Sequence, residues 1–545
     1  MSGARRWAAV TSLCAIAIAS AATGIGNGFT YDDIPIIAQN GRAHDLAHVW
    51  RRFGESYWPP AAGGGRLYRP MPIAAYDVEW ALGHGSPVVF HLANILLYAA
   101  VTLAVFALAR RLMPAPAAWL SAALFAAHPV HAEAVANMVG QAELLAALPF
   151  VVAVWYYLGV RADSKTPSPG ALGVLGALYL AGCLAKEHAV MLPGVLMAAE
   201  LTVIDDRRGW RERTRALAPG AVALVAVGVA FLIVRTRIIG AFVGDSAMLA
   251  LMGSTRSDRV LTMLGATREW LRLLLWPARL AAIYSPPQIA IRHAVDAMVV
   301  AGAFVVASCA AFVIVARRVY PVVAFGVAWV AVVLLPVSNL VAPTGILLAE
   351  RTLFLPSVGL VLAVGGIVAA ALPRVRRWSP MWRVVPVVGT GIVLTIGIWR
   401  SAIRQPVWRD DRTLFTTTVS DAPESYAAHF AYASMLFKAG DVEAAKREGW
   451  LALGLYGGDP MPAYTLGTQY WRAGRCDVAE PMLRQALSLV PPLYNARVKL
   501  EDCLMRRKDW AGARAAALVG IERGPNRAHF RQLLASVDSA ARASQ

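Results

Sequence analysis

Charged residues are scarce in this 545-residue chain. Only 16% of its residues are Asp, Glu, Lys or Arg, whereas 57% are hydrophobic, and the mean hydropathy is +0.51. A soluble globular chain carries about a quarter charged residues, so the composition argues against an ordinary soluble protein. The apolar residues form many runs of membrane-spanning length, about 17–25 residues each. The sequence therefore predicts an all-α, polytopic membrane protein.

Lysine is also rare, since six of the 52 basic residues are Lys and the rest are Arg. The net charge of +18 is typical of Arg-rich cytoplasmic loops in a membrane protein, and we expect no nucleic-acid partner. The Arg- and Ala-rich composition is typical of a GC-rich bacterial genome, which favours the bacterial cytoplasmic (inner) membrane. The sequence contains no Walker loop or GxGxxG-plus-acid pattern, so nothing indicates a cytosolic nucleotide site.

Cysteine is scarce too, with five in the chain. Their spacing fits neither a metal site nor a dense disulfide framework. We therefore predict no metal-binding residues, and no cofactor other than a donor substrate. Cys476 and Cys503 could pair on an oxidising face, but the sequence does not give the distance between them.

About eleven segments are candidate membrane spans, and basic loops orient them. The first could also be read as a cleaved secretion signal, although the many spans that follow suit a first span equally well. Arg-rich segments such as 205–215 and 374–378 belong on the cytoplasmic side, which places loops 24–86, 128–141 and 342–352 on the opposite face. The stretch 256–283 reads as an interfacial helix. The predicted spans are 7–23, 87–109, 115–127, 142–160, 170–184, 189–204, 216–235, 294–316, 321–341, 353–372 and 382–400.

Internal repeats appear after the last span. Ala445, Ala479 and Ala513 are spaced by 34 residues, as are Pro491 and Pro525, which is the tetratricopeptide period. We predict a membrane domain over 1–403 with a long outer loop at 24–86, and a linker over 404–425. The chain should end in an α-solenoid of three tetratricopeptide-like repeats over 426–525, with a capping helix and tail over 526–545. The direction of the last span predicts that this solenoid lies on the extracytoplasmic side.

Two adjacent carboxylates, Asp32 and Asp33, stand in the first outer loop within FTYDDIPIIAQN. A carboxylate at an apolar boundary can act as a general base toward a hydroxyl. An Asp before Ile-Pro can equally cap a short helix. The sequence does not choose between these two readings, nor between the two residues.

Other ionisable residues lie in the outer loops, and each can be interpreted either as functional or as purely structural. His128 and His131 are three residues apart, but a third zinc ligand is not fixed by their spacing, so contacts with polar lipid or substrate groups are favoured. The Arg351 guanidinium could pair with a phosphate or reach out to the membrane interface. The remaining candidates are Tyr68, Arg69, Lys186, Glu187, His188 and Glu350.

The chain resembles the transmembrane-and-tetratricopeptide-repeat glycosyltransferases, a family of the multi-span GT-C class. The motifs that carry the resemblance occur in the family's order over nearly the whole chain. They are YDDIPIIAQN, YRPMPIAAYDVEWALG, HLANILLYAAVTLAVFALARRL, FAAHPVHAEAVANMVGQAELLA, KEHAVMLPGVL, LPVSNL, ERTLFLPSVG and WRDDRTLF. One position departs from the family pattern, because Gln141 stands where an Arg is usual.

The resemblance implies an inverting transfer of a sugar, typically mannose, from a polyprenyl-phosphate donor to a hydroxyl of a protein or glycan acceptor. It implies that Asp32 or Asp33 is the base, and that Arg351, Lys186 and Arg69 hold the donor phosphate. We assign substrate contacts to His128, His131, Glu350, Glu187, His188 and Tyr68. The lipid-phosphate sugar serves as the donor substrate, and a divalent cation is possible but not indicated. The alternative function is a nonenzymatic membrane scaffold that displays the repeats to protein partners.

Overall fold

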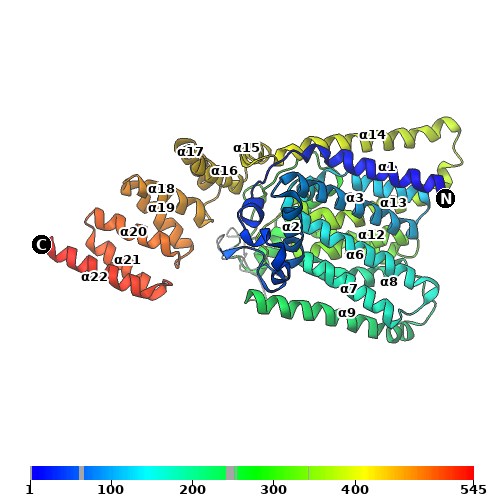
Figure 1. Ribbon diagram of the computed structural model, residues 1–545, viewed down its shortest axis with the longest axis horizontal. Coiled ribbons are helices and arrows are strands. Elements are labelled where there is room, and N and C mark those ends of the chain that lie inside the picture. The colour runs from blue at the N-terminus through cyan, green and yellow to red at the C-terminus, as the bar shows by residue number, and fades with distance from the viewer. Residues whose placement is uncertain (1–2, 61–66, 241–250, 252–253, 342, 545) are drawn as a thin grey trace. The chain divides into compact units, whose positions relative to one another are not determined.

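The computed structural model describes residues 3–60, 67–240, 251, 254–341 and 343–544. Within these ranges the chain is all-helical, without a β-sheet (Figure 1). It divides into two compact units. The first comprises Met1–Ala247, Ser254–Ala282 and Arg292–Leu414, and the second comprises Met248–Gly253, Ile283–Ile291 and Phe415–Gln545.

A bundle of apolar helices forms the first unit, and each predicted span coincides with one of them. Among the described residues, seven helical segments are long and apolar enough to cross a membrane, and α4, α7 and α12 are shorter apolar helices. A multi-pass membrane protein is therefore supported, while the number of spans stays a prediction. The helices are α1 (Gly3–Ala21), α3 (Pro87–Leu112), α4 (Ala115–Ala126), α6 (Gln141–Val160), α7 (Pro169–Ala185), α8 (Leu192–Thr202), α9 (Trp210–Ile239), α11 (Ala297–Ala316), α12 (Pro321–Leu334), α13 (Phe354–Val375) and α14 (Pro380–Arg404).

Helices α12 and α13 pack closely because glycine lies on both contacting faces. A Cβ on Gly326 would clash with the carbonyl oxygen of Gly359, so neither position accepts a larger residue without movement. Beside this contact the buried Trp329 indole donates a hydrogen bond to the carbonyl of Leu355 at 2.9 Å. Small residues allow membrane helices to approach in this way. The contact fixes the N-terminal end of α13, where Arg351 stands in the preceding turn.

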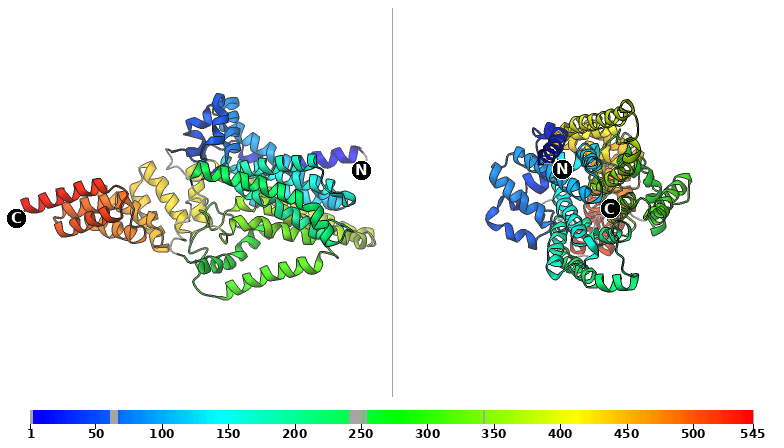
Figure 2. Two further views of the ribbon diagram at one scale, coloured as in Figure 1. Left: turned by 90° about the horizontal axis from the view of Figure 1, so that it is seen from below. Right: turned by 90° about the vertical axis from the view of Figure 1, so that its right-hand side faces the viewer.

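Short helices and loops gather at one end of the bundle. Residues 24–60 and 67–86, in blue, lie there with α2 (Pro70–Gly83) (Figures 1 and 2). They also contain η2 (Ile34–Ala38), η3 (Gly41–His44) and η4 (Leu46–Gly54). The other outer loops form η6 (Pro129–His131), α5 (Ala132–Ala136), η7 (Met138–Gly140), η9 (Glu187–Met191), η11 (Leu335–Val337) and η12 (Glu350–Leu353). The stretch read as interfacial contains α10 (Arg256–Leu275), and η13 (Gln405–Trp408) and α15 (Asp411–Asp421) follow α14.

In the described part of the second unit seven helices follow one another, and successive helix pairs begin 34 residues apart. The turns within successive pairs contain Gly440, Gly474 and Lys508, which all have positive φ, at +84°, +74° and +59°. Ala445 and its two counterparts at the same spacing are fully buried. The helices are α16 (Tyr426–Ala439), α17 (Val442–Leu455), α18 (Pro460–Arg472), α19 (Cys476–Leu489), α20 (Tyr494–Arg506), α21 (Trp510–Arg523) and α22 (Arg527–Ala543).

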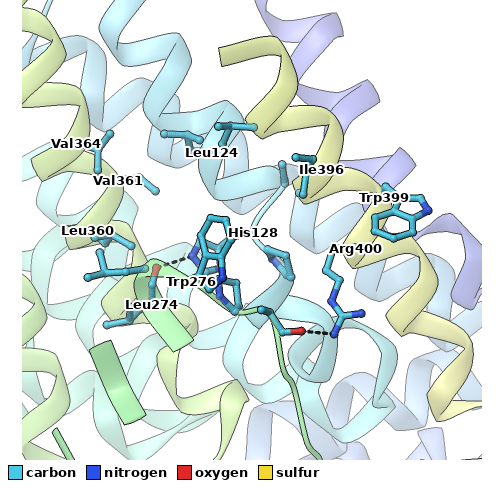
Figure 3. A pocket seen from close by; sticks show the side chains of 17 residues that line it. Leu124, His128, Leu274, Trp276, Leu360, Val361, Val364, Ile396, Trp399 and Arg400 are labelled. Atoms are coloured by element: carbon cyan, nitrogen blue, oxygen red, sulfur yellow. Dashed lines mark hydrogen bonds between the residues drawn. The ribbon is translucent and has the colours of Figure 1, made fainter. Parts of the chain in front are cut away.

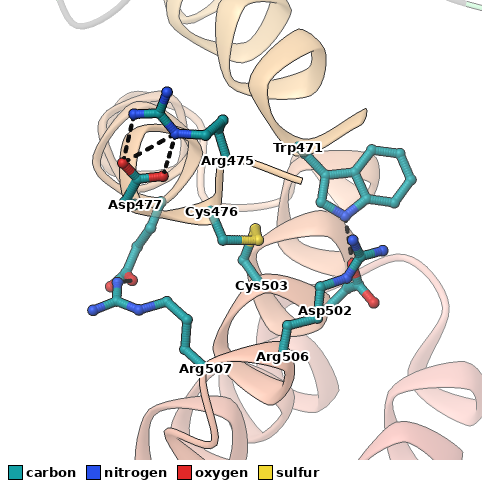
Figure 4. The surroundings of a disulfide bond; sticks show 9 residues. Trp471, Arg475, Cys476, Asp477, Asp502, Cys503, Arg506 and Arg507 are labelled. Atoms are coloured by element: carbon teal, nitrogen blue, oxygen red, sulfur yellow. Dashed lines mark hydrogen bonds and ion pairs between the residues drawn. A yellow bond between two sulfur atoms is a disulfide. The ribbon is translucent and has the colours of Figure 1, made fainter. Parts of the chain in front are cut away.

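A disulfide joins Cys476 and Cys503, and so links α19 to α20 (Figure 4). The bond closes a loop between residues 27 positions apart. Its sulfur atoms lie in a small apolar core that also contains Leu483 and Leu500. The pairing that the sequence left open is thus present in the structure.

Candidate active site

Asp33 is fully buried and bound to the backbone. Its carboxylate accepts hydrogen bonds from the amide of Val139 at 2.9 Å and from that of Thr30 at 3.3 Å. It occupies the N-cap position of η2, but its side chain makes no capping hydrogen bond there. Burial raises the pKa of Asp33 to about 8, although the two amides act in the opposite direction. Asp33 therefore joins the first outer loop to η7, and a substrate does not reach it from solvent.

Asp32 differs from its neighbour because its side chain is only half-buried. No described residue donates a hydrogen bond to its carboxylate. Burial raises the pKa of Asp32, whereas the positive charges of Arg351 and Arg69 lower it, which places both guanidiniums close to this carboxylate. A carboxylate that is accessible and accepts no hydrogen bond from the described residues can accept a proton from a hydroxyl.

The turn that presents Asp32 is held by a residue from the far end of the first unit. Tyr31 adopts a positive φ of 52° directly before Asp32. The Asp411 carboxylate accepts hydrogen bonds from the Tyr31 amide at 2.7 Å and from the Thr30 hydroxyl at 2.8 Å. Asp411 lies in the WRDDRTLF motif, so two distant motifs of the chain meet at this turn.

Arg351 is paired with Glu133, which is almost completely buried in α5. The Arg351 guanidinium donates to one Glu133 oxygen, and the Arg351 amide donates to the other at 2.8 Å. The Arg351 side chain keeps 22% of its surface exposed. The pairing joins the turn before α13 to the second outer loop and leaves part of the guanidinium accessible.

Arg69 forms a bidentate ion pair with Glu187. Its Nε and Nη2 donate to the two carboxylate oxygens at 2.8 and 2.7 Å. The Arg69 charge holds the pKa of Glu187 well below its usual range, even though burial acts in the opposite direction. The guanidinium also lies over the Tyr57 ring, 5.3 Å from its centroid. The first and third outer loops are therefore joined by a planar, charged contact.

Lys186 donates to Glu143 at the start of α6, and both side chains are buried. Burial lowers the pKa of Lys186, while Glu143 raises it. His188 Nδ1 lies 3.6 Å from the second Glu143 oxygen. Arg351 and Arg69 both lie near enough to Lys186 to lower its pKa further, so the three predicted phosphate-binding cations are brought together.

The structure assigns packing or hydrogen-bonding partners to the remaining candidates. The Tyr68 hydroxyl donates to the Phe53 carbonyl at 2.8 Å. The buried Glu350 carboxylate accepts from the Ala281 amide at 2.5 Å. His131 lies between the Tyr98 and Ser357 hydroxyls at 2.9 and 2.8 Å. These contacts hold the outer loops and the start of α13 in place.

His128 faces a different environment from His131. Its Nδ1 accepts a hydrogen bond from the Val130 amide at 3.3 Å, and its Nε2 lies 2.9 Å from the Leu274 carbonyl. That pattern requires the neutral tautomer that carries its proton on Nε2. The ring lines an apolar cavity at the end of α4 (Figure 3).

Two acidic residues of this site were not among the candidates chosen from the sequence, although Glu133 stands close to His128 and His131. Glu133 and Glu143 neutralise Arg351 and Lys186, respectively. Each of these two acidic residues borders a long apolar segment. An ionisable residue in that position is costly, so this pattern could have identified both residues from the sequence. Asp32 and these pairs together form the charged cluster of Asp32, Arg69, Glu133, Glu143, Lys186, Glu187 and Arg351.

Gln141, where the family usually has Arg, contacts another buried acid. Its amide donates to Glu79 in α2 at 2.6 Å. Burial raises the pKa of Glu79 to about 8, and Gln141 lowers it. An Arg at position 141 would supply a full positive charge to this carboxylate, and the amide supplies only a hydrogen bond. Within the described residues no group of three His, Cys, Asp or Glu side chains has the arrangement of a metal site.

Comparison with known proteins confirms the resemblance to the transmembrane-and-tetratricopeptide-repeat proteins. The chain is 27% identical over 485 residues to human protein O-mannosyl-transferase TMTC4, which covers 79% of this chain and 64% of that protein. It is 25% identical to human TMTC1 over 81% of this chain and 54% of the relative. A shorter match to Drosophila melanogaster Tmtc2 is 34% identical, over 32% of this chain and 20% of the relative.

The chain spans about a fifth to two thirds of the length of these curated relatives. No protein-family model matches it. Among solved structures, it is similar to ArnT from Cupriavidus metallidurans bound to undecaprenyl phosphate. That match has 14% identity and a TM-score of 0.41, over 85% of this chain and 80% of ArnT.

Proposed function

We propose that this chain is a membrane glycosyltransferase of the GT-C type, which transfers mannose from a polyprenyl-phosphate-sugar donor to an acceptor hydroxyl. The observation that carries the proposal is Asp32, an unpaired and accessible carboxylate beside two guanidiniums. The relatives of this chain are named protein O-mannosyl-transferases. This similarity supports mannose as the transferred sugar and a protein as the acceptor.

In the proposed reaction Asp32 accepts the proton of the acceptor hydroxyl. The hydroxyl oxygen attacks the anomeric carbon from the face opposite the phosphate, and the bond from that carbon to the phosphate oxygen breaks. The configuration at the anomeric carbon inverts, and polyprenyl phosphate leaves with the bonding electron pair. Arg351, Lys186 and Arg69 stabilise the negative charge that develops on the phosphate.

Asp32 suits this role better than Asp33. A base must lie within hydrogen-bonding reach of the proton that it removes. Both oxygens of Asp33 are occupied by backbone amides in a fully buried site. No described backbone amide binds the Asp32 carboxylate, and the positive charge of Arg351 lowers the pKa of Asp32.

The 34-residue helix pairs of the second unit fit a short tetratricopeptide solenoid, for which we propose a role in engaging the protein acceptor. We propose that the chain lies in a bacterial cytoplasmic membrane with these repeats on the extracytoplasmic side. The Cys476–Cys503 disulfide supports that side, because disulfides persist in oxidising compartments.

Sugar transfer by purified protein in lipid nanodiscs tests the proposal. The protein is incubated with polyprenyl-phosphate [14C]mannose, polyprenyl-phosphate glucose and GDP-mannose as separate donors, and with extracytoplasmic protein acceptors from the same bacterium. We expect labelled acceptor only with a polyprenyl-phosphate donor, and a product of inverted anomeric configuration. Absence of transfer from every lipid-linked donor would contradict the proposal and favour the scaffold function.

A further inference from the structure

Helix pairs of the second unit place a basic residue at the same position, the last turn of the first helix. Lys438, Arg472 and Arg506 occupy it in α16, α18 and α20, spaced by 34 residues. All three side chains are exposed. Because equivalent positions of stacked helix pairs line one face, these residues form a row of cations. A cation there also interacts favourably with the end of its own helix, so the row alone does not indicate a ligand.

Arg506, in the third of these pairs, has a carboxylate partner within the chain. Its Nε donates to Asp502 Oδ2 at 2.8 Å, and the Trp471 indole donates to the same oxygen at 2.5 Å (Figure 4). Trp471 belongs to α18, the first helix of the preceding pair. The face therefore already binds one carboxylate, between a guanidinium and an indole from two successive pairs.

The other two cations of the row have no such partner. Thr468 and Ser434 stand at the positions equivalent to Asp502, 34 and 68 residues earlier, and neither carries a charge. Among the described residues, no carboxylate forms an ion pair with Lys438 or Arg472. The first and second pairs thus present the cation of this arrangement without its acid.

Lys499 of α20 adds a further cation beside the row. Its Nζ lies 5.1 Å from the ring centroid of Tyr464 and 5.5 Å from that of Trp471. It donates to the Tyr464 hydroxyl at 3.2 Å, and no carboxylate in the described part of the chain pairs with it. Lys446, on the second helix α17, also lies 5.2 Å from a tyrosine ring, but it pairs with Glu443 at 2.8 Å.

The surface charge of the first helices is therefore unbalanced. The charged residues of α16, α18 and α20 that are exposed or half-buried are Lys438, Arg472, Lys499, Arg506 and Asp502. Four cations face one carboxylate. A partner with negative charge is electrostatically complementary to this face, and cations that recur from one helix pair to the next require a ligand that extends along the stack. An extended acidic peptide segment has both properties.

We propose that the face formed by α16, α18 and α20 binds an extended acidic segment of a protein. Its carboxylates take, beside Lys438, Arg472 and Lys499, the place that Asp502 takes beside Arg506. This inference rests on the proposed function, which assigns the repeats to the protein acceptor, and it names acidic acceptors as the class that the repeats select.

Peptide binding tests the inference without turnover. The full chain, in nanodiscs of zwitterionic lipid, is titrated with a short fluorescent peptide of alternating Asp and Ser. Matched peptides carry Asn or Lys in place of Asp. We expect binding of the Asp peptide alone, and weaker binding at high salt because exposed charges are screened.

Lys499→Gln and Lys446→Gln are the matched variants. Each removes a lysine that lies just over 5 Å from a tyrosine ring, but only Lys446 has a carboxylate partner. We expect about tenfold weaker binding of the Asp peptide in Lys499→Gln and in Arg472→Gln, and no change in Lys446→Gln. A photoreactive Asp peptide should label α18 and α20 in the unaltered protein, a result that does not depend on the folding of any variant.

Four results would overturn the inference. They are equal binding of the Asp and Asn peptides, equal losses in Lys499→Gln and Lys446→Gln, labelling outside α16, α18 and α20, and equal competition by polyphosphate, which would indicate a surface for any polyanion. Selective binding of the Asp peptide without sugar transfer from any lipid-linked donor would contradict the proposed function alone. Sugar transfer without any preference for the Asp peptide would contradict the inference alone.

Discussion

At the scale of single residues, two adjacent carboxylates have different environments. Asp33 is enclosed and bound to two backbone amides, and Asp32 is half-buried beside Arg351. Tyr31, directly before Asp32, has a positive φ of 52°, and Asp411 holds this turn through the Tyr31 amide. One carboxylate therefore supports the loop, and the other is available for proton transfer.

The buried state of Asp33 predicts a pH dependence of stability. Its folded pKa of about 8 exceeds the unfolded value of about 3.9, so the folded chain retains a proton that the unfolded chain releases between these pH values. Because of Asp33, the free energy of unfolding therefore decreases as the pH rises from about 4 to about 8. Asp33→Asn cannot ionise, and we expect a smaller decrease in its melting temperature between pH 5 and pH 8.

Asp45→Asn serves as the control for that measurement. The pKa of Asp45 is lowered by its hydrogen bond with His48, so its removal should not flatten the same pH profile. At pH 5 we expect Asp33→Asn to cost about 1–3 kcal/mol, because its amide group cannot accept from both backbone donors. An unchanged pH profile in Asp33→Asn would contradict this account of the buried carboxyl.

At the scale of helices, much of the architecture could be predicted. In the part of the chain that the structure describes, the apolar runs located eleven helices of the bundle, and the Ala445 spacing located the helix pairs of the second unit. The ion pairs could not be predicted, because Arg351 and Glu133 are 218 positions apart and local spacing contains no information about such contacts. The same limit applies to Asp411, which binds the turn before Asp32 from a distant segment.

The third repeat turn predicts a stabilising substitution. Lys508 has a φ of 59°, whereas Gly440 and Gly474 occupy the equivalent positions. A side chain in this left-handed conformation is strained. We expect Lys508→Gly to stabilise the α20–α21 pair by up to about 1 kcal/mol, measured as slower hydrogen exchange of its amides. Lys508→Ala keeps the Cβ and should show no such gain, so an equal gain in both variants would contradict the strain.

The disulfide between α19 and α20 predicts a loss of stability on its removal. A crosslink over 27 residues lowers the entropy of the unfolded chain, an effect worth about 3–4 kcal/mol. We expect Cys476→Ser and Cys503→Ser to speed hydrogen exchange in these two helices. Cys309→Ser, which alters a free cysteine of α11, is the matched control. Unchanged exchange in both disulfide variants would show that the bond adds little to the folded unit.

At the scale of the whole molecule, the proposed orientation predicts where each terminus of α14 lies. A reporter fused after Gln545 should give active alkaline phosphatase and nonfluorescent green fluorescent protein, since the second unit is expected outside the cytoplasm. A fusion after Arg377, in the predicted cytoplasmic segment 374–378 that precedes α14, should give the opposite pattern. Matching patterns at the two positions would contradict the orientation and separate the repeats from the proposed acceptor side.

The most direct test of the account is the rate of sugar transfer in Asp32→Asn. The amide has nearly the shape of the carboxylate but cannot accept the proton, so we expect a decrease of about 10²-fold or more in the single-turnover rate. Binding of polyprenyl phosphate should be retained, and Asp33→Asn should keep most of its activity per folded molecule. Full transfer activity in Asp32→Asn would contradict the assignment of Asp32 as the catalytic base.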